Sequence, residues 1–497
     1  MRCFIDPRYS TLTATSSEWQ RRNTVQRPNV IVILADDMGY GDFARFNGSA
    51  SSTPVLDQLM SDGLTFAQHY SASPVCAPAR AALLTGRYPQ RTGVIDTLEA
   101  RGTDRLSLRE TTIADEFSAA GYRTGLIGKW HNGAIDPRYH PTARGFDEFI
   151  GFRGGWQDYW DWRIERNGTP LRADGRYLTD VLADEAVDFL RRTSAQPFLL
   201  HVAFNAPHYP FQAREGDVEV FRQDGRSETV ATIYAMIAAM DSGIGRILET
   251  LDTLKIADNT IVIFTSDNGP QLDRTGDSSA DRFNLGLSGE KLFVWEGGIR
   301  LPLIVRWPAG VRPGTTSDAF LHSTDWFPTL LDLAGIRRRS TAPLDGRSVA
   351  ASIRGDAPLG DDGERFWQWT RYAPTARSNA AMRKNHWKLV FPAIEGTLGV
   401  EQRDQRIDEE IKAHPERFTR VRNESVPDYV DLVHPAPQLF DLHSDPGEQV
   451  DLADRHPELV RSMSARLASW FEEVEAERRS ITDLSIAFPH DTALLKS

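Results

Sequence analysis

The run Val30-Ile-Val-Ile-Leu34 is the first strong indication of the fold, because a short, continuously apolar run followed closely by Asp36-Asp37 is typical of a buried strand. Similar apolar runs follow along the chain, and segments with helical spacing separate several of them. The runs span residues 124–128, 198–204, 260–265 and 303–305. This alternation predicts an α/β fold with a large, mostly parallel sheet covered by helices on both faces.

The pattern changes after residues 355–363, which are rich in Pro, Gly and Asp. We therefore expect an N-terminal extension over 1–28, an α/β domain over 29–358 and a smaller C-terminal α+β subdomain over 359–497. The subdomain is predicted to contain a short antiparallel sheet, a charged and irregular insertion over about 395–435, and a final amphipathic helix. The predicted strands are 366–372, 380–390 and 438–442, and the helix carries apolar residues from Leu459 to Val474.

Composition excludes several classes of protein. The net charge of -12 argues against non-specific binding of nucleic acid, which requires a basic surface. With only Cys3 and Cys76, no disulfide framework is visible. Residues 1–28 contain no apolar leader segment, and no apolar run reaches the length of about 18 residues that spans a membrane. We therefore expect a cytoplasmic protein that does not insert into a membrane.

Polar residues follow four of the five predicted strands. They are Asp36-Asp37, Lys129 with His131, His208, and Asp267-Asn268. In open α/β sheets ligands bind just beyond the carboxyl ends of the strands, so these residues are predicted to share one site. Three carboxylates and an amide are all oxygen donors, which favours Ca²⁺, and Mg²⁺ as second choice, over zinc.

A longer motif begins at Cys76. The string Cys76-x-Pro78-x-Arg80-x-x-x-Leu84-Thr85-Gly86-Arg87 places a cysteine in a predicted loop before a short helical segment. On its own, Cys76 is also compatible with an ordinary reactive thiol. The complete string resembles the signature of the sulfatase family, within the alkaline-phosphatase-like superfamily, although Ala79 stands where that family usually has Ser.

Other segments resemble the same family in the same order along the chain. They are residues 128–133, 206–210, 289–291 and 296–302, and recognisable similarity runs from about residue 29 to residue 306. Asn132 departs from the family pattern without changing Lys129 or His131. The resemblance implies that the α/β domain is catalytic and that the chain hydrolyses sulfate esters, of small molecules or of carbohydrates.

The resemblance also implies a modified residue and a metal. A maturation enzyme would oxidise Cys76 to formylglycine (3-oxoalanine), whose hydrated aldehyde has two hydroxyls, one to attack sulfur and one to release the sulfate. One Ca²⁺ per chain, or Mg²⁺, would be held by Asp36, Asp37, Asp267, Asn268 and the modified Cys76.

Five further residues receive catalytic roles from the resemblance. Arg80 and Lys129 would hold the hydrated aldehyde and a sulfate oxygen, and His131 would take a proton from the second hydroxyl. His208 would donate a proton to the departing alcohol, and Lys291 would bridge the sulfate and that alcohol oxygen. Fixed cations around developing negative charge would stabilise the transition state.

An aromatic-rich stretch over 152–162 follows the Lys129 segment and has neither strand nor helix periodicity. We expect it to form a loop in which Trp156, Tyr159 or Trp160 lines the leaving-group side of the cleft. Trp367 and Trp369 would approach the same rim. The alternative is that these aromatic side chains are packed in the core.

Two other functions stay open from the sequence. A phosphonate monoester or phosphodiester hydrolase of the same superfamily can share the formylglycine motif. A catalytically silent binder of sulfated ligands would result if Cys76 were never oxidised. A two-zinc phosphatase is disfavoured, because the predicted metal segments lack clustered histidines. The sequence does not indicate the alcohol or the oligomeric state.

Overall fold

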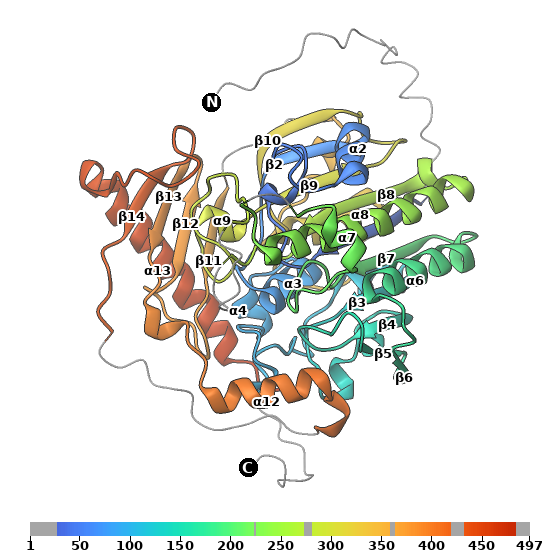
Figure 1. The fold of residues 1–497 in the computed structure, drawn as a ribbon. Helices are drawn as coiled ribbons and strands as arrows, with labels where there is room; N and C mark the ends of the chain where they lie inside the picture. The colour runs from blue at the N-terminus through green and yellow to red at the C-terminus, as the bar shows by residue number, and fades with distance from the viewer. Residues whose placement is uncertain (1–26, 223–224, 273–280, 358–362, 419–431, 484–497) are drawn as a thin grey trace.

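The computed structural model describes residues 27–222, 225–272, 281–357, 363–418 and 432–483. Cys3, the predicted extension up to residue 26 and the predicted boundary at 358–359 lie outside these residues. Within them the chain forms a ten-stranded sheet and a separate four-stranded sheet (Figure 1).

The ten-stranded sheet has the order β10-β2-β9-β8-β1-β7-β3-β4-β5-β6. Its strands are β1 (Asn29–Ala35), β2 (Leu64–Tyr70), β3 (Arg123–Lys129), β4 (Glu148–Phe152), β5 (Arg163–Arg166), β6 (Thr169–Arg172), β7 (Phe198–Ala203), β8 (Thr260–Ser266), β9 (Arg300–Arg306) and β10 (Thr315–His322). The five predicted runs form the central strands, and β8, β1, β7, β3 and β4 are parallel to their neighbours in that series. The prediction of a mostly parallel sheet is confirmed, although β9 runs antiparallel to both β8 and β2.

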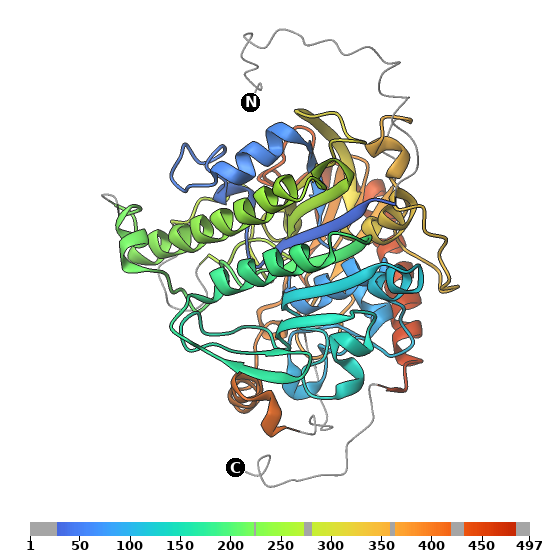
Figure 2. The ribbon, with the colours of Figure 1, turned by 90° about the vertical axis from the view of Figure 1, so that its right-hand side faces the viewer.

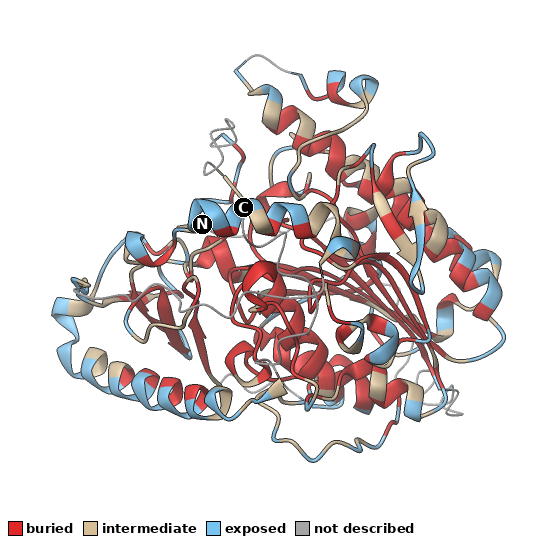
Figure 3. Cartoon of the chain, turned by 90° about the horizontal axis from the view of Figure 1, so that it is seen from below, coloured by how far each residue is buried: buried red, intermediate tan, exposed pale blue. Residues whose placement is uncertain are grey.

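Helices cover both faces of this sheet, as predicted (Figure 2). Successive residues of β1 point to opposite faces, so Ile31 and Ile33 pack in one apolar cluster and Val30 and Val32 in another. The first cluster involves α2 (Pro54–Asp62), α6 (Leu178–Thr193), α7 (Glu215–Glu219) and α8 (Glu228–Thr253). The second involves α3 (Cys76–Thr85), α5 (Ile113–Ala119), α10 (Trp326–Leu333) and α11 (Ala350–Ile353). The sheet is therefore buried along most of its length (Figure 3).

Helix α8 is long and apolar enough, by length and composition alone, to cross a membrane. In the structure 67% of its most apolar window is buried. The helix packs beside α6 over the sheet (Figures 1 and 2). This placement is typical of a core helix in a globular domain.

The four-stranded sheet is antiparallel, with the order β11-β12-β13-β14. Its strands are β11 (Glu364–Gln368), β12 (Ala380–Lys384), β13 (Trp387–Phe391) and β14 (Gln438–Asp441). The final helix α13 (Pro457–Arg479) covers one face, and the other packs against Tyr70, Val294 and Phe320 of the large domain. The single strand expected over 380–390 is a hairpin, in which Asn385 adopts a positive φ of 54° at the turn.

The charged insertion is not irregular throughout. Residues Gln402–Ala413 form helix α12, and only residues 419–431 of the insertion lie outside the described part of the chain. Its sequence has too few apolar residues for a clear amphipathic pattern, which is why a helix was not predicted. Its short buried face consists of Asp404, Asp408 and Ile411.

A buried ion cluster connects the two sheets. Lys388 of β13 lies 2.9 Å from Glu296 of α9 (Glu296–Ile299) and 2.8 Å from Glu448, and all three side chains are fully buried. Glu296 also accepts a hydrogen bond from the Tyr70 hydroxyl at 2.6 Å. Arg300 also lies 3.6 Å from Glu296, but Lys388 is the cation that contacts both carboxylates. Removing Lys388 would leave Glu448 buried without a cation and Glu296 with only the longer pair, which is far more costly than burying the complete cluster.

We therefore predict that Lys388→Met lowers the free energy of unfolding by about 3–5 kcal/mol, measured by urea denaturation. The matched control is Lys384→Met on the neighbouring strand, whose ammonium pairs with Glu364 but is 53% exposed. The control substitution should lower the free energy of unfolding by less than about 1 kcal/mol, because exposed ion pairs contribute little to stability. Equal, small losses in the two variants would contradict a linking role for Lys388.

Candidate active site

The predicted catalytic and metal residues converge at the carboxyl edge of the large sheet. Asp36-Asp37 follow β1, Lys129 ends β3, and Asp267-Asn268 follow β8. Donor atoms of Asp36, Asp37, Cys76 and His208 all lie within 4.8 Å of one another. Residues far apart in sequence are thus brought together because parallel neighbouring strands end at the same edge.

Three buried carboxylates each have a close cation at this edge, and Arg80 also lies 3.5 Å from Asp36. Each of the six side chains is almost completely withdrawn from solvent, so each charge depends on its partner. The closest distances are 2.7 Å for Lys129–Asp36, 2.6 Å for Lys291–Asp37 and 2.7 Å for Arg80–Asp267. Without a metal ion, the three carboxylates and three cations balance.

The two adjacent aspartates have opposite pKa shifts. Burial raises the pKa of Asp36 to about 7, against the opposing effect of Lys129. Burial acts on Asp37 as well, but Lys291 and His208 outweigh it and hold the pKa of Asp37 below its ordinary range. Asp37 is therefore the more firmly ionised of the pair.

Sequence reasoning missed the residues that shape the Asp36-Asp37 turn. Asp37 has a positive φ of 65°. Arg282 donates to the Asp37 carbonyl at 2.8 Å and to both carboxylate oxygens of Asp42 at 2.8 and 2.7 Å. Gly41 is required nearby, because a Cβ there would lie 1.8 Å from the Phe283 carbonyl oxygen. The proximity of Asp42 to the aspartate pair was a usable signal, whereas Arg282 lies 240 residues away from Asp42 in sequence.

The residues present fit a hard cation. The Asn268 amide NH₂ donates to Asp37 at 2.7 Å and to the Gly269 carbonyl at 2.9 Å. Its Oδ1 is buried and has no hydrogen-bond partner within the described residues. A buried acceptor beside ionised carboxylates is suited to an oxygen-binding cation. Asp267 contacts Arg80 and accepts backbone N–H groups of Asp37 and Asn268, so its role as a ligand stays a prediction.

Cys76 is the first residue of helix α3, which corrects the expectation that it lies in a loop before the helix. Its side chain is buried, at 2% exposure. Burial raises the pKa of the thiol to about 12, even though Lys129 and Lys291 favour the thiolate. An unmodified Cys76 would therefore be a weak nucleophile.

The two histidines have different surroundings. His208 Nε2 is 3.7 Å from Asp37, and burial together with Lys291 holds the pKa of His208 well below its usual value. Burial and Lys129 do the same for the pKa of His131. The His131 Nδ1 atom is buried without a hydrogen-bond partner in the described structure, and its Nε2 lies 3.6 Å from Glu99. His131 thus has a neutral ring with one nitrogen available to accept a proton.

Helix α12 of the insertion packs beside His131, which the sequence did not indicate. Asp408 accepts the backbone N–H of Ala100 at 3.0 Å, and Asp404 accepts from Arg101 at 2.7 Å. Lys412 pairs with Asp408, and the Lys412 charge also acts on Glu99. Through these contacts the insertion positions the element η3 (Glu99–Arg101), which lies at the edge of the catalytic centre.

Most of the aromatic residues expected at the rim pack in apolar clusters, which agrees with the alternative that the sequence left open. Tyr159, Trp367 and Trp369 are buried, at 1%, 0% and 2% exposure, and so belong to the core. Trp160 is 38% exposed and lies against the Tyr177 ring at 5.1 Å. Trp156 is half-buried, and its role in substrate binding stays a prediction. The stretch is a loop, as expected, but its large rings hold the loop onto α6.

Comparisons with known proteins agree with this geometry. The model of the sulfatase family matches residues 28–336, and that of the N-sulphoglucosamine sulphohydrolase C-terminal region matches 288–396. Human N-acetylgalactosamine-6-sulfatase is 30% identical over 88% of this chain and 84% of its own length. Mouse steryl-sulfatase is 30% identical over 88% of this chain and 81% of its own.

A solved structure supports the same assignment. The crystal structure of Ps i-CgsB in complex with k-i-k-neocarrahexaose has a TM-score of 0.75 and 29% identity, covering 94% of this chain and 96% of that one. Because the family model matches more than half of the chain, the protein belongs to the sulfatase family and is a sulfuric ester hydrolase.

Tyr159 has a different role from the one predicted from sequence. Its hydroxyl lies 2.7 Å from the Asn205 carbonyl and 2.8 Å from the His208 carbonyl, so it holds the loop that carries His208. We predict that Tyr159→Phe lowers kcat/KM for an aryl sulfate about tenfold or more, because small displacements of a catalytic group are costly.

The matched control is Tyr177→Phe. Tyr177 is stacked on Tyr159 at 5.3 Å, and its hydroxyl donates to the Gln212 carbonyl at 2.7 Å. Both variants should lose about 1–3 kcal/mol of stability, because each leaves a buried carbonyl without its donor. Steady-state kinetics and thermal denaturation measure the two effects. Equal losses of kcat/KM in both variants would contradict a specific role for Tyr159 in holding the His208 loop.

Proposed function

We propose that this chain hydrolyses a sulfate ester of a carbohydrate, with Cys76 oxidised to formylglycine and one Ca²⁺, or Mg²⁺ as second choice, bound beside it. The observation that carries the proposal is the position of Cys76. It lies at the start of α3, with donor atoms of Asp36, Asp37 and His208 within 4.8 Å. A thiol in this position is protonated, whereas an oxidised residue there would face both oxygen donors and cations.

The charge balance supports an anionic substrate. The three carboxylates are each matched by a lysine or arginine, so a bound dication would give the centre an excess of positive charge. A sulfate ester, with its single negative charge, would offset part of that excess. Lys129, Lys291 and Arg80 would then be shared between the aspartates and the sulfate oxygens, and would stabilise charge that develops on them.

Proton transfer would be divided between the two histidines. The hydrated aldehyde of formylglycine would supply the attacking hydroxyl, and the metal would polarise the sulfate ester. His131 is neutral, with Nδ1 unpartnered, and is therefore suited to accept a proton. His208 lies beside Asp37, and the negative charge of an arriving sulfate ester would raise the pKa of His208 toward the range needed to protonate the leaving alcohol.

The relatives favour a carbohydrate as the alcohol. One relative is named for N-acetylgalactosamine 6-sulfate, and a solved neighbour is bound to a neocarrahexaose. The C-terminal match to an N-sulphoglucosamine sulphohydrolase covers the part of the chain that includes Trp369 and β12. Steryl-sulfatase is similar to the same degree, so the test includes both a sugar sulfate and an aryl sulfate.

The test of the nucleophile combines mass spectrometry with kinetics. Chain produced together with a formylglycine-generating enzyme should contain a peptide with an aldehyde at Cys76. Cys76→Ala should fold and lose essentially all turnover of 4-nitrophenyl sulfate and of N-acetylgalactosamine 6-sulfate. Full activity with only the thiol present would overturn the mechanism. A higher rate on a matched aryl phosphonate would assign the chain to phosphonate hydrolysis instead.

The metal is tested by stability, independently of turnover. At calcium concentrations about 100 times the dissociation constant, we expect about 2.7 kcal/mol of stabilisation over chelator-treated protein, seen in thermal denaturation. Asn268→Leu should lose most of this effect. The control Asn132→Leu should keep it, since the Asn132 amide contacts only carbonyls of Ala77 and His131 among its described partners. A shift with zinc but not with calcium or magnesium would contradict the oxygen-ligand site.

A further inference from the structure

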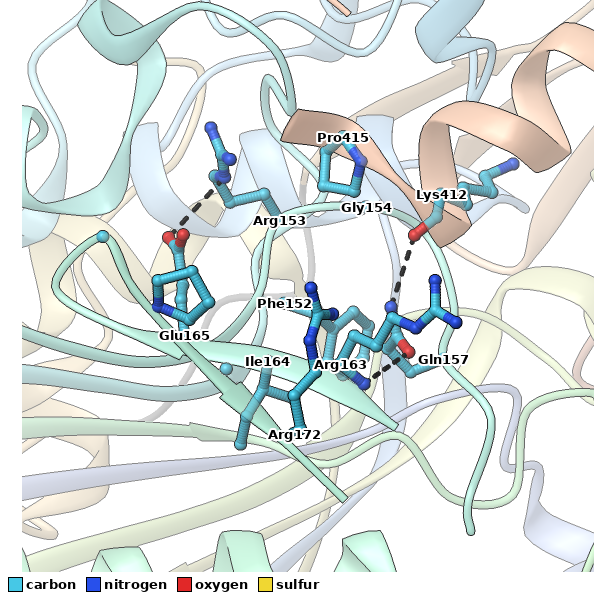
Figure 4. Close-up of a pocket in the computed structure, with 13 residues that line it drawn as sticks. Phe152, Arg153, Gly154, Gln157, Arg163, Ile164, Glu165, Arg172, Lys412 and Pro415 are labelled. Atoms are coloured by element: carbon cyan, nitrogen blue, oxygen red, sulfur yellow. Dashed lines mark hydrogen bonds and ion pairs between the residues drawn. The ribbon is translucent and has the colours of Figure 1, made fainter. Parts of the chain in front are cut away.

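A cavity with several charged side chains in its lining lies beside the loop that follows β4, near His131. It has a volume of about 130 Å³ and is formed by the end of β4, the β5–β6 hairpin and the end of α12 (Figure 4). Its charged lining residues are Arg153, Arg163, Arg172, Lys412 and Glu165. The cavity therefore combines the large domain with the insertion, and four of its five charged side chains are cations.

The single carboxylate of the cavity is already engaged. Glu165 accepts a hydrogen bond from His140 at 2.6 Å and pairs with Arg153 at 3.6 Å. Lys412 is likewise paired, with Asp408. The positive charge that is left over belongs to Arg163 and Arg172.

Arg163 and Arg172 have little neutralising charge nearby. Among the described residues, no carboxylate lies within ion-pair distance of Arg172, which is exposed. Within the described part of the chain, Arg163 has one carboxylate at ion-pair distance, that of Asp161, at 3.8 Å and 82% exposed, and such a pair is weak. Arg163 Nη1 also lies 2.7 Å from the His414 ring, which does not neutralise its charge as a carboxylate would. Neither guanidinium group therefore has a firm carboxylate partner among the described residues.

One loop separates this cavity from the catalytic histidine. A Cβ at Gly155 would lie 2.7 Å from the His131 ring and 3.0 Å from Cε of Lys412, so only glycine fits between them. The Gly155 N–H donates to Glu99 at 2.7 Å, which fixes the loop. His131 and Lys412, which lines the cavity, therefore lie on either side of Gly155. A chain-like substrate whose sulfate lies beside His131 would have to extend past this loop for its neighbouring units to meet Arg163 and Arg172.

We infer that this cavity is a second anion-binding subsite, which takes a sulfate or carboxylate group on a glycan unit other than the one that carries the scissile ester. The inference rests on the proposed carbohydrate sulfatase function. Guanidinium groups bind both oxyanions through paired N–H donors, which distinguishes them from neutral hydroxyls. The preferred substrate is accordingly a polyanionic oligosaccharide.

The binding test uses full-length protein with Cys76→Ala, so that no turnover occurs. Isothermal titration with a chondroitin 6-sulfate tetrasaccharide compares this protein with a form that also carries Arg163→Gln and Arg172→Gln. We expect the affinity to fall by about tenfold or more, as loss of charge-assisted contacts predicts. Unsulfated chondroitin tetrasaccharide, which has carboxylates only, shows which oxyanion the cavity takes.

The matched control replaces two exposed arginines elsewhere, with Arg191→Gln on α6 and Arg461→Gln on α13. It changes the net charge by the same amount and should leave the affinity unchanged. Equal weakening in the control, unchanged affinity in the cavity variant, or no binding of either tetrasaccharide would overturn the inference.

Kinetics separate this inference from the proposed function. With Cys76 intact, the Arg163→Gln/Arg172→Gln variant should hydrolyse 4-nitrophenyl sulfate at an unchanged kcat/KM, since this small monoanion does not reach the cavity. A proportional loss on that substrate would show general damage and overturn the subsite. Absence of aryl and sugar sulfatase activity in the unsubstituted protein would instead refute the proposed function, while the titration would still report on the cavity.

Discussion

The structure depends on the balance of buried charge at the carboxyl edge of the large sheet. Asp36, Asp37 and Asp267 could not remain ionised away from water without close cations, because each uncompensated buried charge costs several kcal/mol. The cations come from helix α3, from the end of strand β3 and from a later loop. Each pairing therefore restricts how those segments can be arranged around the sheet.

Buried carboxylates are also paired with buried cations in the C-terminal part of the chain, outside the catalytic centre. Lys388 supplies the cation that the buried Glu296 requires, so the small sheet is attached by charge as well as by its apolar face. Lys412, in the insertion, similarly places a positive charge near the buried Glu99. Because these lysines contact the large domain, the C-terminal subdomain contributes directly to the surroundings of the active site.

Several features could not be predicted from the sequence, for one common reason. The positions of Tyr159 and Trp369 depend on which neighbours pack against them, and an aromatic run without periodicity contains no information about those neighbours. Helix α12 was missed because its buried face contains Asp404 and Asp408, whose partners lie about 300 residues earlier in the chain. From sequence alone, a buried aspartate cannot be distinguished from a surface aspartate.

The central strands, the order of the sulfatase-like motifs and the grouping of the strand-end residues in one site could all be predicted from the sequence. These features are local, since apolar runs, turn residues and the Cys76 motif are each read within a few positions. The tertiary structure was needed to show which cation pairs with which carboxylate, that Tyr159 holds the His208 loop, and that Arg163 and Arg172 line a cavity. Those outcomes depend on contacts between distant segments, and such contacts are set by packing and charge compensation in three dimensions.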